Sequence, residues 1–142
     1  MNTLIGCALM PHHPDIIPEI GQEKSIELHA TAIAMMQAIN ALKEKNPQTF
    51  VVITPHGPSF DDTVSISIHP RLKGNMAGFD APDLVLGFET DGLLSRQIIK
   101  KCDRLGIDLV QLTDDLAKRY RIELQLDYGA FVPLYYVHKA GF

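Results

Sequence analysis

The order of the first three segments constrains the fold most strongly: an apolar run, a long helical pattern and a second apolar run. Residues 3–10 are almost continuously apolar up to Pro11, which predicts a strand covered on both faces. Residues 23–45 lack Gly and Pro and space apolar side chains helically, which predicts a long amphipathic helix. Residues 49–54 are β-branched and aromatic and end at Pro55, which predicts a second strand. This order is typical of a right-handed βαβ unit with parallel strands.

The remaining segments continue the alternation of strands and helices. Strands are expected at 63–68 and 83–88, with an irregular loop at 70–82 between them. They are followed by a helix at 91–105 that Gly106 ends and by a strand at 107–112. A helical turn from Thr113 and a last helix from Leu126 complete the chain order. The loop is given no function. This order predicts one α/β domain over residues 1–142, with an open, mostly parallel sheet and helices on both faces.

Composition and charge exclude several classes of protein. The 142 residues carry 13 Lys and Arg against 17 Asp and Glu, for a formal charge of -4. No basic field is therefore present to bind nucleic acid or an anionic membrane. No apolar run approaches the roughly 20 residues of a membrane span, and the N-terminal run lacks the basic residues of a signal peptide. Cys7 and Cys102 form no CxxC pair, and Cys7 is expected to be a buried free thiol, so we expect a reducing cytoplasm.

Histidines follow both strands of the predicted βαβ unit. His12 and His13 come directly after the first strand, and His56 comes directly after the second. Ligands of open α/β sheets bind beyond the carboxyl ends of the strands, so we expect these imidazoles to converge. Neutral imidazole is a common ligand of zinc, iron, copper and nickel, which predicts a metal site. The alternative is that they are loop histidines that hydrogen-bond backbone groups, since no local spacing such as HExxH supports a metal.

The other chemically active residues do not extend this site by their position in the sequence. His29, His69 and His138 are interpreted as structural. The acidic residues considered, mostly as caps or turn residues, are Asp15, Glu19, Asp61, Asp62, Glu123 and Asp127. None is an obvious third ligand for a site of two His and one carboxylate. Hydrolase and nucleotide-binding functions gain no support, because a nucleophile elbow and a Gly-rich phosphate loop are both missing.

Three segments share a family pattern: residues 10–21 (MPHHPDIIPEIG), 53–58 (ITPHGP) and 126–134 (LDYGAFVPL). Together they resemble the class III extradiol ring-cleavage dioxygenases of the LigB superfamily. Residues 73–74 and 79–82 are similar to the corresponding segments in one branch of the superfamily. This branch is often found with the AmmeMemoRadiSam system and includes Memo-like relatives. Members of the superfamily are typically longer, so the chain resembles an N-terminal half.

The resemblance implies a ferrous ion held by His12, His56 and a carboxylate far down the chain. Many relatives have a His, acting as acid or base, where this chain has Tyr128. A phenol, with a pKa of about 10, is a poor base at neutral pH but can donate a hydrogen bond. Tyr128, Asp127 and His13 are therefore the candidates for shaping proton transfer.

The function that these features favour is cleavage of catechol-like aromatic rings with dioxygen at a non-haem Fe(II) site. The alternative is a non-catalytic metal-binding or protein-interaction module on the same fold. A zinc-dependent hydrolase using the same two histidines is a third interpretation, because Zn(II) accepts imidazole and activates water. A homo-oligomer, or a completing domain or subunit, is expected to supply the third metal ligand, which the two imidazoles do not provide.

Overall fold

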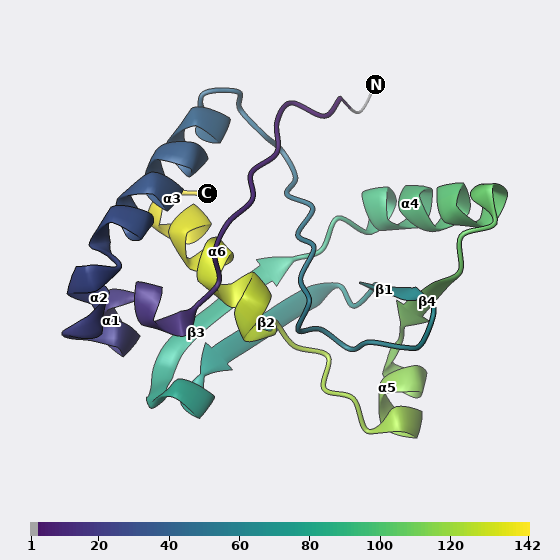
Figure 1. The fold of residues 1–142 in the computed structure, drawn as a ribbon. Coiled ribbons are helices and arrows are strands. Elements are labelled where there is room, and N and C mark those ends of the chain that lie inside the picture. The colour runs from purple at the N-terminus through teal and green to yellow at the C-terminus, as the bar shows by residue number, and fades with distance from the viewer. Residues whose placement is uncertain (1–2) are drawn as a thin grey trace.

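The computed structural model describes residues 3–142, in which helical segments come first and strands and helices are mixed from Val64 on (Figure 1). In chain order the elements are η1 (Pro14–Ile16), α1 (Pro18–Gly21), α2 (Lys24–Glu27), α3 (His29–Lys43), β1 (Val64–Ser67), β2 (Arg71–Met76), η2 (Ala77–Phe79), β3 (Ala81–Glu89), α4 (Gly92–Leu105), β4 (Leu109–Leu112), α5 (Asp114–Tyr120) and α6 (Tyr128–Lys139). The predicted α/β class is confirmed.

Within the described residues the strands form two small sheets. β1 pairs with β4 in parallel, from Val64 opposite Leu109 to Ser67 opposite Leu112. β2 and β3 form an antiparallel hairpin with an irregularity at Asn75 and Met76. In Figure 1 the hairpin lies beside α6 and α3, while β1 and β4 lie on the other side of the molecule with α4 and α5. A parallel pair is thus present, but it joins β1 to β4 and not the segments 3–10 and 49–54, for which parallel pairing was predicted.

The core is built around α6. Phe131 and Val132 of this helix are completely buried, as are Ile17 and Ile39, which reach the core from the turn before α1 and from α3. The helix contacts α3 and β2, so it joins the N-terminal helices to the hairpin. Burial of such apolar side chains is the main favourable contribution to folding.

Two tyrosines of α6 hold the turn that follows His13. The Tyr136 hydroxyl donates to the Ile16 carbonyl at 2.7 Å, and the Tyr135 hydroxyl donates to the Glu19 carboxylate at 2.8 and 2.9 Å from its two oxygens. Burial, with a further contribution from Glu19, raises the pKa of Tyr135 above its usual range. Tyr135 therefore remains a neutral donor at physiological pH, and the turn is fixed to the helix.

The two strands expected at residues 3–10 and 49–54 are not formed, which corrects the prediction. Neither segment has a strand partner among the described residues, and a strand needs a neighbour for its backbone hydrogen bonds. Their apolar side chains are largely uncovered: Leu9 is fully exposed and Ile53 is 92% exposed. Cys7, expected to be buried, is exposed for the same reason.

Other elements follow the predictions closely or differ for local reasons. The long helix is divided at Leu28, which separates α2 from α3. The prediction of a loop at 70–82 is wrong, because β2 and η2 occupy most of this range. Pro82 cannot donate a hydrogen bond to a neighbouring strand, and it lies at the irregularity of the hairpin. The helix predicted at 91–105 is confirmed, with Gly106 ending it at a φ of 65°.

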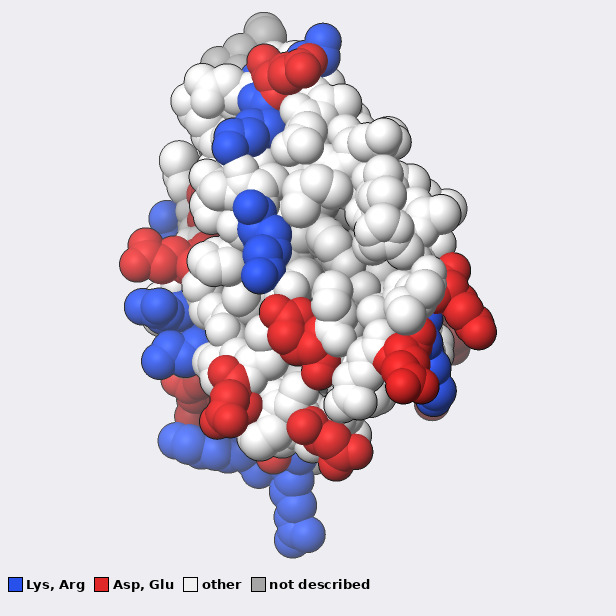
Figure 2. All heavy atoms as spheres, turned by 90° about the vertical axis from the view of Figure 1, so that its left-hand side faces the viewer, with Lys and Arg blue, Asp and Glu red and all other residues white. Residues whose placement is uncertain are grey.

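The uncovered segments adjoin a wider surface that lacks charge. Residues 3–11, 29–42 and 49–59 contain no Asp, Glu, Lys or Arg. Figure 2 shows a broad uncharged area on the side of the molecule where α3 lies, with acidic side chains gathered below it. Uncovered apolar segments of this kind favour association with another polypeptide. Separately, no helix among the described residues is long and apolar enough to cross a membrane.

We expect Ile53→Lys to lower self-association of the isolated chain without lowering its stability. Because Ile53 is already 92% exposed, its replacement should change the free energy of unfolding by less than about 0.5 kcal/mol. Light scattering after size exclusion measures association, and urea unfolding measures stability. Leu105→Lys, at the exposed end of α4, is the control. Equal association of the wild type and both variants would contradict the expectation.

Candidate functional site

Two histidines meet at the ends of the uncovered segments. His12 follows residues 3–10 and His56 follows residues 49–54, and their Nε2 atoms lie 2.9 Å apart. The ring centroids are 4.8 Å apart with an interplanar angle of 67°, so the rings approach edge to face. One Nε2–H donates to the other Nε2, which means that both nitrogens point at the same small volume. The structure therefore brings these two imidazoles together although the strands before them are not formed.

Tyr128, the first residue of α6, contacts the opposite edge of the His56 ring. Its hydroxyl oxygen lies 2.9 Å from His56 Nδ1, and the two ring centroids are 4.1 Å apart. Phe79 of η2 packs against Tyr128 with a centroid distance of 5.4 Å. Tyr128 is thereby held between His56 and Phe79, and its hydroxyl is committed to the imidazole.

Asp127 is the N-cap of α6 and also holds the segment before His56. Its Oδ1 accepts from the Ala130 N–H at 3.1 Å and from the Thr54 hydroxyl at 2.6 Å. Thr54 Oγ1 in turn accepts from the His56 N–H at 3.2 Å. An N-cap carboxylate satisfies backbone donors that the helix leaves free. Asp127 therefore positions the His56 turn, and both acceptor roles of Oδ1 are structural.

Gly129 allows this close approach of α6. A Cβ atom at Gly129 would lie 2.5 Å from Thr54 Oγ1, 2.8 Å from His56 Cδ2 and 2.9 Å from Asp127 Oδ1. All three distances are shorter than van der Waals contact, so a side chain here would push the helix away from His56.

His13 faces the same region from the start of η1. Its Nδ1 accepts from the Asp15 N–H at 3.3 Å, which makes His13 the N-cap of the short helix. The Asp15 carboxylate lies 3.9 Å from His13 Nδ1 and 3.7 Å from Lys24 Nζ. The His13 side chain is 68% exposed and lines the same cavity as His56.

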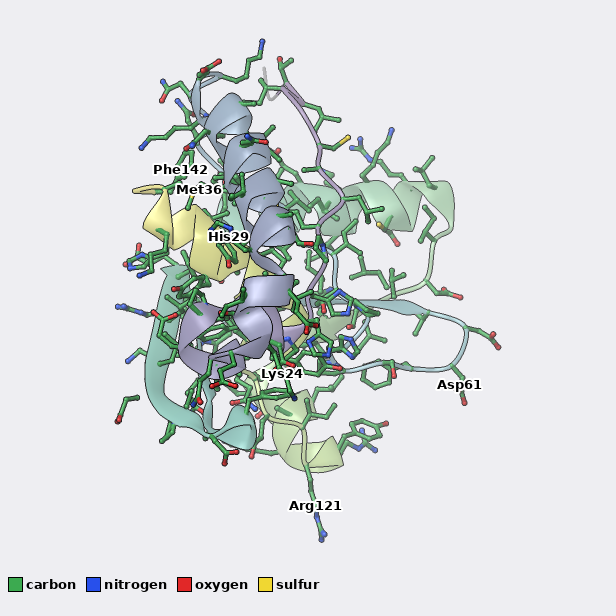
Figure 3. All side chains as sticks on the ribbon, turned by 60° about the vertical axis from the view of Figure 1, so that its left-hand side comes forward. Lys24, His29, Met36, Asp61, Arg121 and Phe142 are labelled. Atoms are coloured by element: carbon green, nitrogen blue, oxygen red, sulfur yellow. The ribbon has the colours of Figure 1, made fainter. Side chains whose placement is uncertain are left out.

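The remaining candidates lie outside this cluster. His29 begins α3, and Asp61 lies at the exposed tip of the loop after His56 (Figure 3). His69 Nδ1 bonds the Arg71 carbonyl at 2.6 Å, and His138 is exposed near the end of α6. The other acidic residues have separate partners or exposed positions: Glu19 accepts from Tyr135, Glu123 accepts from Gln125, and Asp62 is exposed in the loop.

A cavity of about 590 Å³ opens in front of the two imidazoles. It is lined by residues 11–14, His56, Phe79 and Tyr128. Phe79 is the residue that sequence reasoning did not assign, because residues 70–82 looked irregular. The sequence feature that contains Phe79 is the family pattern at residues 79–82. Recognising the hairpin would have put Phe79 at its turn, beside the site.

The two imidazoles fit two positions on one metal ion. Ligands about 2.1 Å from an ion and at right angles to each other lie about 3.0 Å apart, close to the 2.9 Å between the Nε2 atoms. No group of three or more His, Cys, Asp or Glu side chains that could hold a metal occurs among residues 3–142. The described residues therefore bring two possible metal ligands together and no third one.

Comparisons with known proteins give one family and one curated relative. A family model described as the catalytic LigB subunit of aromatic ring-opening dioxygenase matches residues 6–141. Protein CA_C1420 of Clostridium acetobutylicum is 28% identical over 137 residues. That match covers 96% of this chain and 29% of the relative, so the chain spans less than a third of the relative's length. No solved structure gives a significant match.

We expect Gly129→Ala to separate α6 from the His56 turn. The added Cβ meets Thr54 and His56 at less than 3 Å, so the variant should lose about 1–3 kcal/mol of unfolding free energy. The His56 imidazole resonances should also shift, as measured by two-dimensional NMR. Gly78→Ala is the matched control, because a Cβ there has no neighbour within 4 Å. Unchanged His56 resonances in Gly129→Ala would contradict the described packing.

Proposed function

The chain belongs to the family of catalytic LigB subunits of aromatic ring-opening dioxygenases, and on this premise we propose that it holds a non-haem ferrous ion for the cleavage of catechol-like rings by dioxygen. The observation that carries the proposal is the pair of Nε2 atoms, from His12 and His56, that lie 2.9 Å apart at the mouth of a cavity. Imidazole suits ferrous iron, and two His ligands are part of the facial triad of non-haem iron oxygenases.

His12 and His56 hold the ion through their Nε2 lone pairs. The proton of the neutral His56 ring then lies on Nδ1, where the Tyr128 oxygen at 2.9 Å accepts it. A partner on the second nitrogen of a ligating His fixes its tautomer and the direction of its ring. Tyr128 therefore acts as a positioning residue for His56, and its phenol replaces the His that relatives use as acid or base.

His13 is the group best placed to move a proton. Because its Nδ1 accepts from the Asp15 N–H, the neutral ring carries its proton on Nε2, and His13 is one of the residues that line the cavity. His13 can therefore donate this proton to a substrate oxygen and recover it from solvent. Asp127 supports the site structurally, by accepting from the Ala130 N–H and from the Thr54 hydroxyl. When bound, ferrous iron supplies the redox chemistry that lets dioxygen react with the ring.

Completion of the site requires another polypeptide or a second copy of the chain. Residues 3–142 contribute two metal ligands, and two imidazoles alone would hold ferrous ion loosely. The uncovered apolar segments 3–10 and 49–54 lead directly to these ligands. A homo-oligomer or a completing domain that covers these segments would lie next to the ion, where it can provide the carboxylate.

A second candidate function is a non-catalytic metal-binding or protein-interaction module. The observations that favour it are the two-ligand site and the commitment of the Tyr128 hydroxyl to His56. Zn(II) is the alternative metal for such a module, because it accepts imidazole ligands and has no redox chemistry. This candidate predicts metal binding without consumption of oxygen.

We expect the purified chain, dialysed anaerobically to equilibrium against excess ferrous ion, to bind about one iron per chain above the level in the buffer by elemental analysis, because two imidazoles hold the ion too loosely to retain it once free metal is removed. The His12→Ala, His56→Ala double variant should lose this iron, and His29→Ala, on α3, is the control that should keep it. Oxygen uptake with catechol then separates the dioxygenase from the non-catalytic module. Equal iron content in the wild type and the double variant would overturn the metal site.

A further inference from the structure

The cavity in front of His12 and His56 has no formally charged lining. Its walls are the turn at residues 11–14, His56, Phe79 and Tyr128, and none of these is Asp, Glu, Lys or Arg. From this lining we infer that the substrate is a catechol-like ring without an anionic substituent, selected by Phe79. The inference rests on the proposed function, and it names the substrate class of the same site.

Phe79 and Tyr128 form the aromatic wall of the cavity. Their rings meet edge to face with a centroid distance of 5.4 Å and an interplanar angle of 66°. Phe79 is 36% exposed, so part of its ring remains available to a ligand. A planar ring in the cavity can pack against this aromatic surface while its hydroxyl groups face the two imidazoles. Aromatic pairs of this kind add attraction beyond the burial of apolar area.

The charges beyond Phe79 disfavour a carboxylate on the ring. Phe79 also lines an adjoining cavity of about 250 Å³, whose charged residues are Asp15, Glu19, Asp80 and Lys24. Lys24, the one cation among them, lies 3.7 Å from the Asp15 carboxylate. Glu19 has Lys139 at 3.8 Å, so Asp80 is the carboxylate that leaves an excess of negative charge for a ring substituent that extends past Phe79. An anionic substituent would be repelled there and would leave its own charge without a partner.

The imidazoles are the basic groups that face the cavity, so both ligands must be tested in the same buffer. His13 has the Asp15 carboxylate at 3.9 Å, and His12 and His56 face each other and Tyr128. Comparing catechol with its carboxylated form in one buffer leaves these imidazoles in the same state for both ligands, so the difference in affinity reports on how the lining treats the carboxylate.

Calorimetry of the zinc-loaded chain at pH 8, with catechol and with 3,4-dihydroxybenzoate, tests the inference. Zinc is used because it has no redox chemistry. We expect catechol to bind at least about tenfold more tightly than the carboxylated ring. Phe79→Ala should weaken catechol binding by about three- to tenfold. Phe79→Arg should reverse the preference, because a guanidinium pairs with a carboxylate.

Phe60→Ala is the matched control, since Phe60 packs against Tyr120 outside the cavity, and it should leave both affinities unchanged. Equal or tighter binding of 3,4-dihydroxybenzoate by the wild type would overturn the inference, as would zinc retention without binding of either ring. Phe79→Leu, which keeps an apolar side chain, replaces Phe79→Ala if that variant does not fold.

Loss of zinc by the wild type would instead count against the proposed metal site. In that case the same two compounds are added to the metal-free chain, and the Phe79 ring resonances are followed by NMR. Shifts with catechol and none with 3,4-dihydroxybenzoate support the inference without a metal. Shifts with both compounds, or with neither, overturn it.

Discussion

The site depends on the contact between the N-terminus of α6 and the turn at His56. Asp127 Oδ1 accepts from both the helix and the Thr54 hydroxyl, at 3.1 and 2.6 Å, so one oxygen joins the two elements. Gly129 permits this approach because a Cβ atom would lie 2.5 Å from Thr54 Oγ1. Tyr128 is thereby delivered to His56 Nδ1, and His56 is turned toward His12. The buried body of α6 makes the arrangement rigid.

Stability and chemistry are divided unevenly over the chain. The apolar core joins α6 to α3, the first turns and the hairpin, whereas residues 3–10 and 49–54 lead to the histidines proposed as ligands and leave apolar side chains in solvent. Because His12 and His56 follow two uncovered segments, a polypeptide that packs on these segments can change the positions of both imidazoles. The lack of a third ligand among the described residues and the uncharged surface around α3 support the proposal that a further polypeptide completes the site.

Chain order predicted the neighbourhood of His12 and His56, because residues that follow consecutive strands of a βαβ unit share one edge. The strands themselves were not predicted correctly, since apolar composition cannot show whether a pairing partner is present. The Gly and Pro residues within 70–82 suggested a loop, so the hairpin was not predicted and Phe79 was not assigned to the site. The role of Gly129 was also beyond the sequence, because it depends on a contact with Thr54, which is far away in the chain.

If His12 and His56 hold one ion jointly through their Nε2 atoms, crystallographic anomalous scattering at the iron edge, from crystals grown anaerobically with ferrous ion, will show one peak about 2.1 Å from both nitrogens. Tyr128 will remain bonded to His56 Nδ1. A peak bound to one imidazole alone, or located away from both, would show that the two histidines do not share an ion.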